Sequence, residues 1–205
     1  MRSLCSRLLL ALAFFPLRAS AQRRWPADQD ANQLVPGKAV PAPACRASTP
    51  ILTSDSLGPL HPGMSLEAVL RACPRAYFGW HWEEGIPEPA LAIPLGRSVA
   101  LAMLQDTAGP KAVVYRILVA DSGVRTKEGI GPGSRLRYMT AAWGLPKMGA
   151  AECALYVWFD AQPHLSWIME FPPNWDCSRL ENFVADSSSA KLPPDLRAGI
   201  GILGK

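Results

Sequence analysis

Apolar residues recur with helical spacing at two places in the chain. Around residue 70 they stand at i, i+3, i+4 and i+7, and around residue 140 at i, i+3 and i+7, so each set shares one face of a helix. Pro74 ends the first helix and Gly144 the second, and we expect Ser65 and Ser134 to cap the first turns. The core-facing residues are Leu66, Val69, Leu70 and Cys73 in the first helix and Leu136, Met139 and Trp143 in the second.

The second helical stretch repeats the first at a constant distance along the chain. Four residues of the first stretch recur 70 positions later, and a fifth pair, Leu60 and Ile130, is conservative. A constant offset indicates two copies of one small unit. The identical pairs are Pro62 and Pro132, Gly63 and Gly133, Leu66 and Leu136, and Ala72 and Ala142.

Strands are predicted after each helix, because alternating and β-branched runs lie between turn residues. A helix followed by antiparallel strands, twice over, predicts an α+β fold of two related helix-plus-antiparallel-sheet units, with the helices on one sheet face. The units are expected at 51–122 and 123–205. We expect a loop at 83–89. The expected strands are 76–82, 90–95, 98–105, 111–120, 154–160 and 164–171, with a last one at 196–203 that its glycines weaken.

Alternation also divides the aromatic residues between the two faces of the expected sheet. Leu155, Val157 and Phe159 suit the face that a helix covers, which leaves Tyr156 and Trp158 on the opposite, open face. By the same argument Phe78, Trp80 and Trp82 belong to the core, while Tyr77 and His81 point outward. Tyr156, Trp158, Tyr77 and His81 are therefore our candidate binding residues. The alternative is a second layer that covers them.

The first 21 residues predict a signal peptide. A basic start with Arg2 and Arg7 precedes an apolar run at 8–17, and Ala19-Ser20-Ala21 is a small-residue cleavage site. The run is too short to span a bilayer, and we expect no membrane span after cleavage. Residues 22–50, rich in Pro and Ala, predict a disordered leader. The mature protein is expected in the periplasm or outside the cell.

Charge and cysteine usage agree with export. Without Arg2, Arg7 and Arg18, the 21 basic residues fall to 18 against 17 acidic ones, so no nucleic-acid partner is expected. Four cysteines remain in the mature chain, and they allow three pairings. We predict the pairing that keeps each bridge inside its own unit, which joins Cys45 to Cys73 and Cys153 to Cys177.

No motif in the sequence identifies a reaction, and we expect no catalytic residue, no cofactor and no metal ion. G-x-S-x-G and H-E-x-x-H are absent. His81 and Glu83 could both face a metal from one strand, but no third ligand is evident. The glycine turn at 129–133 opens a helix and could receive an anion. Its basic rim, Arg125, Lys127, Arg135 and Arg137, is the weaker candidate site, and a solvated surface is the alternative.

The stretch G-M-S-L-E-A-V-L at 63–70 resembles the helix opening of the small-protein-A and β-lactamase-inhibitor-like domains. The second copy has Ser134-Arg135 where that motif has Met-Ser. The resemblance covers only the two short helical stretches. It implies helices on one face of an antiparallel sheet and an exported protein that binds other proteins.

These observations together predict an exported, non-enzymatic binding module with an aromatic open sheet face and a protein or peptide partner. Two alternatives remain open, which are a small exported hydrolase and a structural factor in envelope assembly. An enzyme should show a cleft where several ionisable groups meet, and a binding protein should show an open aromatic face.

Overall fold

The computed structural model describes residues 45, 51–83, 86–95, 99–105, 112–151, 153–171, 177, 180, 184 and 192–204. The predicted signal peptide and, apart from Cys45, the predicted leader lie outside these residues. No helix of the described part is long and apolar enough to cross a membrane.

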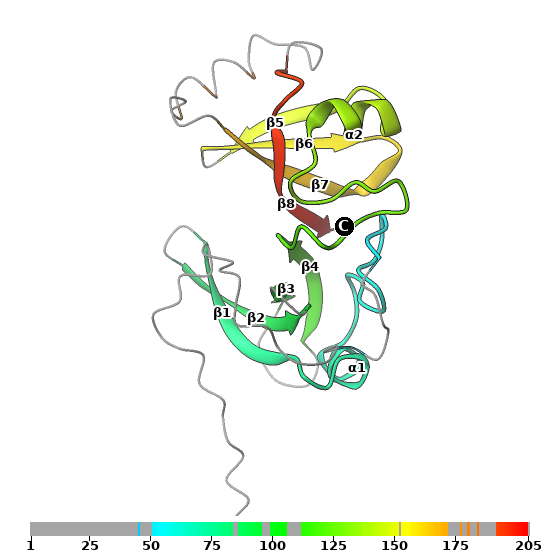
Figure 1. Cartoon of the computed structure of the whole chain (residues 1–205). Coiled ribbons are helices and arrows are strands. Elements are labelled where there is room, and N and C mark those ends of the chain that lie inside the picture. The colour runs from blue at the N-terminus through cyan, green and yellow to red at the C-terminus, as the bar shows by residue number, and fades with distance from the viewer. Residues whose placement is uncertain are drawn as a thin grey trace, which may run out of the picture.

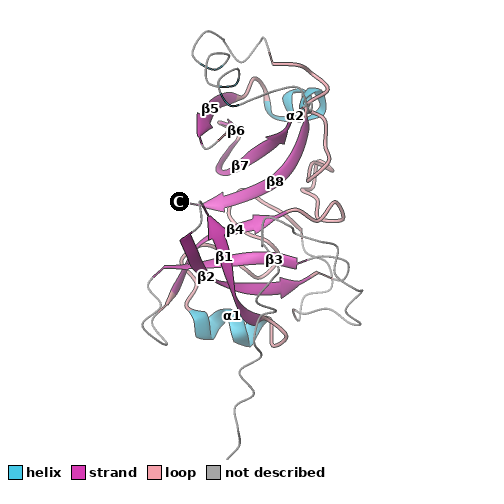
Figure 2. Ribbon diagram, turned by 90° about the vertical axis from the view of Figure 1, so that its left-hand side faces the viewer, coloured by secondary structure: helices cyan, strands magenta, loops and turns pink. Residues whose placement is uncertain are grey.

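Eight antiparallel strands form one continuous sheet, in the order β1-β2-β3-β4-β8-β7-β6-β5 (Figures 1 and 2). The expected α+β fold of two helix-plus-sheet units is therefore wrong, because β4 pairs with β8 and merges all the strands into one predominantly β structure. The boundary between 122 and 123 stays a prediction. The strands are β1 (Tyr77–Glu83), β2 (Ile86–Pro94), β3 (Val99–Gln105), β4 (Val113–Val119), β5 (Lys147–Ala151), β6 (Ala154–Phe159), β7 (Gln162–Glu170) and β8 (Arg197–Gly204).

Two short helices, α1 (Leu66–Ala72) and α2 (Leu136–Trp143), cover one face of this sheet, which we call the helix face. Ser65 caps α1 as predicted, because its hydroxyl accepts a hydrogen bond from the N–H of Ala68. The predicted cap at Ser134 is wrong. Arg135 holds the capping position without a side-chain bond, and the Ser134 hydroxyl accepts from the N–H of Gly131 instead.

The repeat seen in the sequence is present in the local structure. Each of the two turns before a helix binds the start of a distant strand through three equivalent backbone hydrogen bonds. The donor and acceptor pairs are Gly63 to Val114, Val114 to Met64 and Leu66 to Ala112 around β4, and Gly133 to Ala198, Ala198 to Ser134 and Leu136 to Leu196 around β8.

The equivalence extends through the sheet, including its irregularities. Counted from these bonds, Tyr115 of β4 corresponds to Gly199 of β8, and each is the extra residue of a β-bulge. By the same count Leu118 corresponds to Ile202, and these two residues face each other where β4 pairs with β8. The two halves of the sheet therefore meet at equivalent residues, Leu118 of β4 and Ile202 of β8.

Strand β8 lies at the centre of the sheet although its glycines weaken the prediction of a strand there. Gly201 faces Trp167, and a Cβ at Gly201 would come within 3.0 Å of the indole ring. Trp167 is buried beneath α2, where it stacks on Trp143 with ring centroids 6.5 Å apart. The glycine therefore makes room for the largest side chain of the core.

Strand β5 was not predicted. Its sequence is K-M-G-A-A, and Gly and Ala are depleted in strands, so no local signal marks it. Strand β2 begins at Ile86, inside the loop expected at 83–89. A loop was expected there because Pro is disfavoured inside strands, and Pro87 and Pro89 lie in this stretch.

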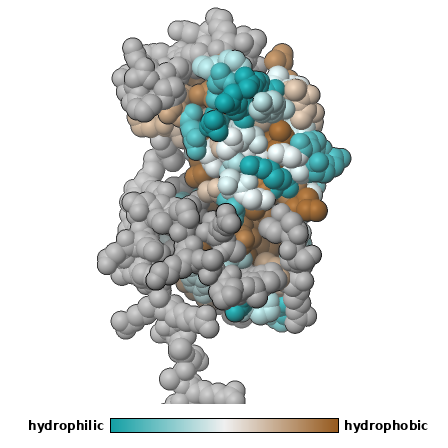
Figure 3. Space-filling model, in the orientation of Figure 1, coloured by the Kyte–Doolittle hydropathy of each residue, from teal (hydrophilic) through white to brown (hydrophobic). Residues whose placement is uncertain are grey.

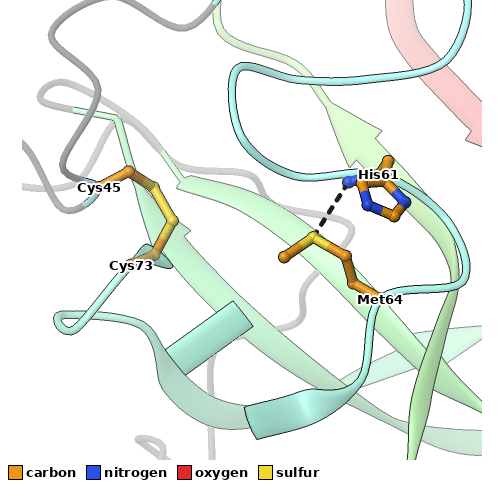
Figure 4. The surroundings of a disulfide bond; sticks show 4 residues. All are labelled: Cys45, His61, Met64 and Cys73. Atoms are coloured by element: carbon orange, nitrogen blue, oxygen red, sulfur yellow. Dashed lines mark hydrogen bonds between the residues drawn. A yellow bond between two sulfur atoms is a disulfide. The ribbon is translucent and has the colours of Figure 1, made fainter. Parts of the chain in front are cut away.

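Both predicted disulfides are present in the structure. Cys45 is bonded to Cys73, the residue that follows α1, so this bond holds Cys45 at the end of the first helix (Figure 4). Cys153, in the turn between β5 and β6, is bonded to Cys177, which follows β7 along the chain. Each bond closes a loop of moderate length, with separations of 28 and 24 residues, which constrains the unfolded chain.

We predict that Gly201→Ala lowers the free energy of unfolding by about 1–3 kcal/mol, because the added methyl group overpacks the buried Trp167. Gly204→Ala is the matched control on the same strand, since its Cβ would meet nothing nearer than 4.0 Å. Chemical denaturation of both variants measures the difference. Equal stabilities of the two variants would show that Trp167 moves aside freely.

Candidate functional site

The face of the sheet opposite the helices, here called the far face, differs between the two halves of the sheet. In the half formed by β1 to β4 it carries a small second core of buried apolar residues. Tyr77 of β1, Tyr115 of β4 and two isoleucines of β8 pack against this core. The buried members are Ala90, Ala92, Leu101, Met103 and Leu118. The far face of the first half is therefore closed.

The far face of the other half carries large aromatic residues on β6, where the corresponding residues of β2 are alanines. Counted from the two bulges, Met103 corresponds to Ile168, and their neighbours Ala90 and Tyr156 correspond to each other. Trp158, two residues after Tyr156 on β6, corresponds in the same way to Ala92, two residues after Ala90 on β2. Tyr156 and Trp158 are half-buried, whereas Leu155, Val157 and Phe159 are buried on the helix face as predicted.

A groove of about 400 Å³ crosses the far face at the junction of the two halves. Trp158 forms one side of it, and its indole lies over the backbone of Gly149, where a Cβ would come within 3.4 Å of the ring. Tyr115 and Arg116 of β4 form the other side. Ser166 of β7 and Ile202 and Gly204 of β8 line the groove between them, and His164 lies at the start of β7.

A carboxylate holds the Tyr115 side of the groove in place. Glu88 accepts hydrogen bonds from the Tyr115 hydroxyl and from the Arg116 guanidinium, the latter at 3.2 Å. Burial raises the pKa of the Tyr115 phenol above its ordinary value of 10.0, and the hydrogen bond to Glu88 and its negative charge raise it further. The phenol therefore stays protonated as a donor. Sequence reasoning missed this group, because Glu88 lies in the expected loop and 27 residues from Tyr115.

The structure separates the four predicted binding residues. Trp158 lines the groove, and Tyr156 lies on the same strand and the same face. Tyr77 and His81 lie on β1, and five strands separate β1 from β6 in the order of the sheet. Tyr77 packs against the second core and His81 is only 8% exposed, so neither points outward as expected.

The alternation along β1 was predicted correctly but assigned to the wrong faces. Phe78 and Trp80 were expected in the core, and each is 50% exposed. Period-two alternation shows that neighbouring residues face opposite ways, and it does not show which face is covered. Here the far face of β1 packs inward on the second core. The side chain of Trp82 lies outside the described residues.

All four basic residues predicted to bind an anion have partners within the protein. Arg125 donates to the Pro132 carbonyl at 2.7 Å, across Gly131, where a Cβ would collide with its side chain. Arg135 and Arg137 both pair with Asp195, at 3.4 and 3.0 Å. These contacts hold the turn and the start of α2.

Lys127 is 88% exposed, lies 3.6 Å from Glu128 and lines a second hollow of about 300 Å³ beside the β6–β7 hairpin. Among the described residues, no three His, Cys, Asp or Glu side chains lie close enough to hold a metal ion. Hydrophilic and hydrophobic residues are interspersed on the described surface seen in Figure 3. That surface shows no large block of one kind.

A solved structure has a similar fold. The crystal structure of the uncharacterized protein yfeY from Escherichia coli matches with a TM-score of 0.51 and 17% sequence identity, over 75% of this chain and 99% of that one. No protein-family model matches the chain, and no curated protein matches it. The similarity concerns the fold alone, and the resemblance to small-protein-A and β-lactamase-inhibitor-like domains remains an expectation.

We predict that Tyr115 ionises at a higher pH than an exposed tyrosine, and that Glu88→Gln lowers its pKa by removing the neighbouring charge. A raised pKa in the folded state gives stability that is complete below about pH 10 and is lost as the pH rises through the folded-state pKa. The unfolding free energy should therefore fall above about pH 10. Phenolate absorbance, compared with that of Tyr115→Phe, identifies the signal. A wild-type Tyr115 that titrates at the ordinary value would contradict the assignment.

Proposed function

We propose that the protein is an exported binding protein whose far-face groove holds an extended segment of a partner protein. The observation that carries this proposal is the difference between equivalent positions of the two halves. Ala92 is fully buried in the closed half, and Trp158 stands at the side of a groove in the other. Trp158 is only partly buried, and Trp is enriched where proteins bind each other.

The shape and chemistry of the groove favour a peptide segment over a small metabolite. It is an open trough across strands with aromatic sides, whereas small-molecule sites are usually clefts that bury most of the ligand. Ile202 supplies apolar surface, and Ser166 can hydrogen-bond a backbone amide. A large apolar side chain of the partner would lie between Trp158 and Tyr115.

Charges at the groove favour an uncharged segment. Arg116 already pairs with Glu88 at 3.2 Å, and His164 lies 3.8 Å from Asp55. A charged ligand would have to compete with these carboxylates or be repelled by them. We therefore expect the bound segment to be apolar or aromatic and low in charge.

The proposed location rests on the disulfides and on the predicted signal peptide. Disulfides form and persist in oxidising compartments, and this chain has two. We infer a periplasmic or secreted protein.

A phage-displayed library of random peptides tests the proposal. Wild-type protein should select peptides rich in aromatic or large apolar residues, and Trp158→Ala should weaken their binding by about 30-fold, or about 2 kcal/mol, with an unchanged melting temperature. Tyr138→Ala is the control, because Tyr138 is 55% exposed on α2 and outside the groove. Selected peptides that bind Trp158→Ala as well as wild type would overturn the proposal. Peptides that are cut during selection would indicate the hydrolase alternative instead.

A further inference from the structure

The two strands that form the floor of the far-face groove are paired on both sides. Ser166 of β7 stands opposite Trp158 of β6 and opposite Ile202 of β8, and Ile202 in turn stands opposite Leu118 of β4. The sheet therefore cannot accept a further strand at this place. A segment that lies in the groove must satisfy its own N–H and C=O groups, leave them in water, or lack them.

The aromatic sides of the groove leave room for one chain between them. Trp158 on β6 and Tyr115 on β4 are separated by three strand spacings, or roughly 14 Å between their backbones. The floor between them is low, because Ser166 has a short side chain and Gly204 has none, while Ile202 supplies apolar surface. Grooves with aromatic sides are where proline-rich segments dock in several classes of peptide-binding domain.

The charges at the groove are complementary to a proline-rich ligand. Glu88 lies 3.2 Å from Arg116, and Asp55 lies 3.8 Å from His164, so each of these carboxylates has a basic partner within the protein. Proline is uncharged and has no N–H, so a proline-rich segment needs no opposite charge and brings few donors that must be paired. Its carbonyl groups can accept a hydrogen bond from the Ser166 hydroxyl or from water.

Building on the function proposed above, and depending on it, we propose that the groove binds a proline-rich segment of a partner protein in the polyproline II conformation. One large apolar residue of the segment, with its flanking prolines, lies between Trp158 and Tyr115. Polyproline II has no internal hydrogen bonds, and its backbone stays in water. Such a segment therefore loses nothing by lying on strands whose backbones are already paired.

A helical ligand is disfavoured by the cost of forming it. The groove of about 400 Å³ holds only a few side chains, which a helix would supply from about one turn. Helices shorter than about 12–15 residues are marginal in water, so such a segment would have to be ordered on binding. Polyproline II is already a major conformer of proline-rich chains, so little ordering is left to oppose its binding.

Fluorescence polarisation with three labelled peptides tests the proposal. The first is A-P-P-L-P-P-L-P-P-A. In the second every proline is replaced by alanine, which favours a helix, and in the third by threonine, which favours a strand. We expect the proline peptide to bind at least about 10-fold more tightly than the other two. Trp158→Ala and Tyr115→Leu should each weaken its binding by about 10-fold or more, and Tyr138→Ala, which lies on α2 outside the groove, is the matched control.

The bound conformation has its own readout, which needs only the wild-type protein. Transferred nuclear Overhauser effects of the proline peptide should join neighbouring residues only, since contacts between residues three or four apart belong to a helix. Equal or tighter binding of the alanine or threonine peptide would overturn the proline preference, and so would binding of displayed-library peptides but of none of these three. In both cases a loss of binding in Trp158→Ala would leave the groove as a peptide site. A protein that binds neither these peptides nor any from the library would overturn the proposed function as well.

Discussion

The pairing of β4 with β8 holds the whole architecture together. It joins two four-stranded halves along four register pairs, and its central pair, Leu118 and Ile202, is supplied by corresponding residues of the two halves. The turns before α1 and α2 bind the starts of these same two strands through their backbones. Helix position, sheet continuity and the groove that crosses the junction therefore all depend on β4 and β8 lying side by side.

The local elements could be predicted from the sequence, and their assembly could not. Helical spacing located α1 and α2, and the constant offset located their repeated turns, because both signals are contained within short windows. Which strands become neighbours is a long-range property. Nothing near Val119 or Gly201 indicates that they pair, so two separate sheets were expected where one formed. Glycine is depleted in strands, so Gly201 in β8 and Gly149 in β5 lowered the strand signal. Each of these glycines makes room for a neighbouring indole ring.

The candidate site was predictable only where one strand contained its signal. Trp158 was identified by alternation along β6, and the structure places it beside the groove. Tyr115 and Arg116 come from another half of the sheet, and Glu88 orders them through bonds that span 27 and 28 residues. Such a group has no local pattern. The same limit explains β1, where alternation was correct but the covered face depended on residues of β2, β3 and β4 packing into a second core.

The position of β8 has a consequence for the order of events as the chain is made. Strand β8 at the centre of the sheet follows all the other described strands along the chain, so the two halves cannot join until residues 197–204 have emerged. Until then β4 and β7 both present unpaired edges, in a segment whose strands are rich in Val, Ile and Leu. The chain therefore passes through a stage in which β4 and β7 each lack a neighbouring strand, and that interval is where a chaperone would have the most to protect.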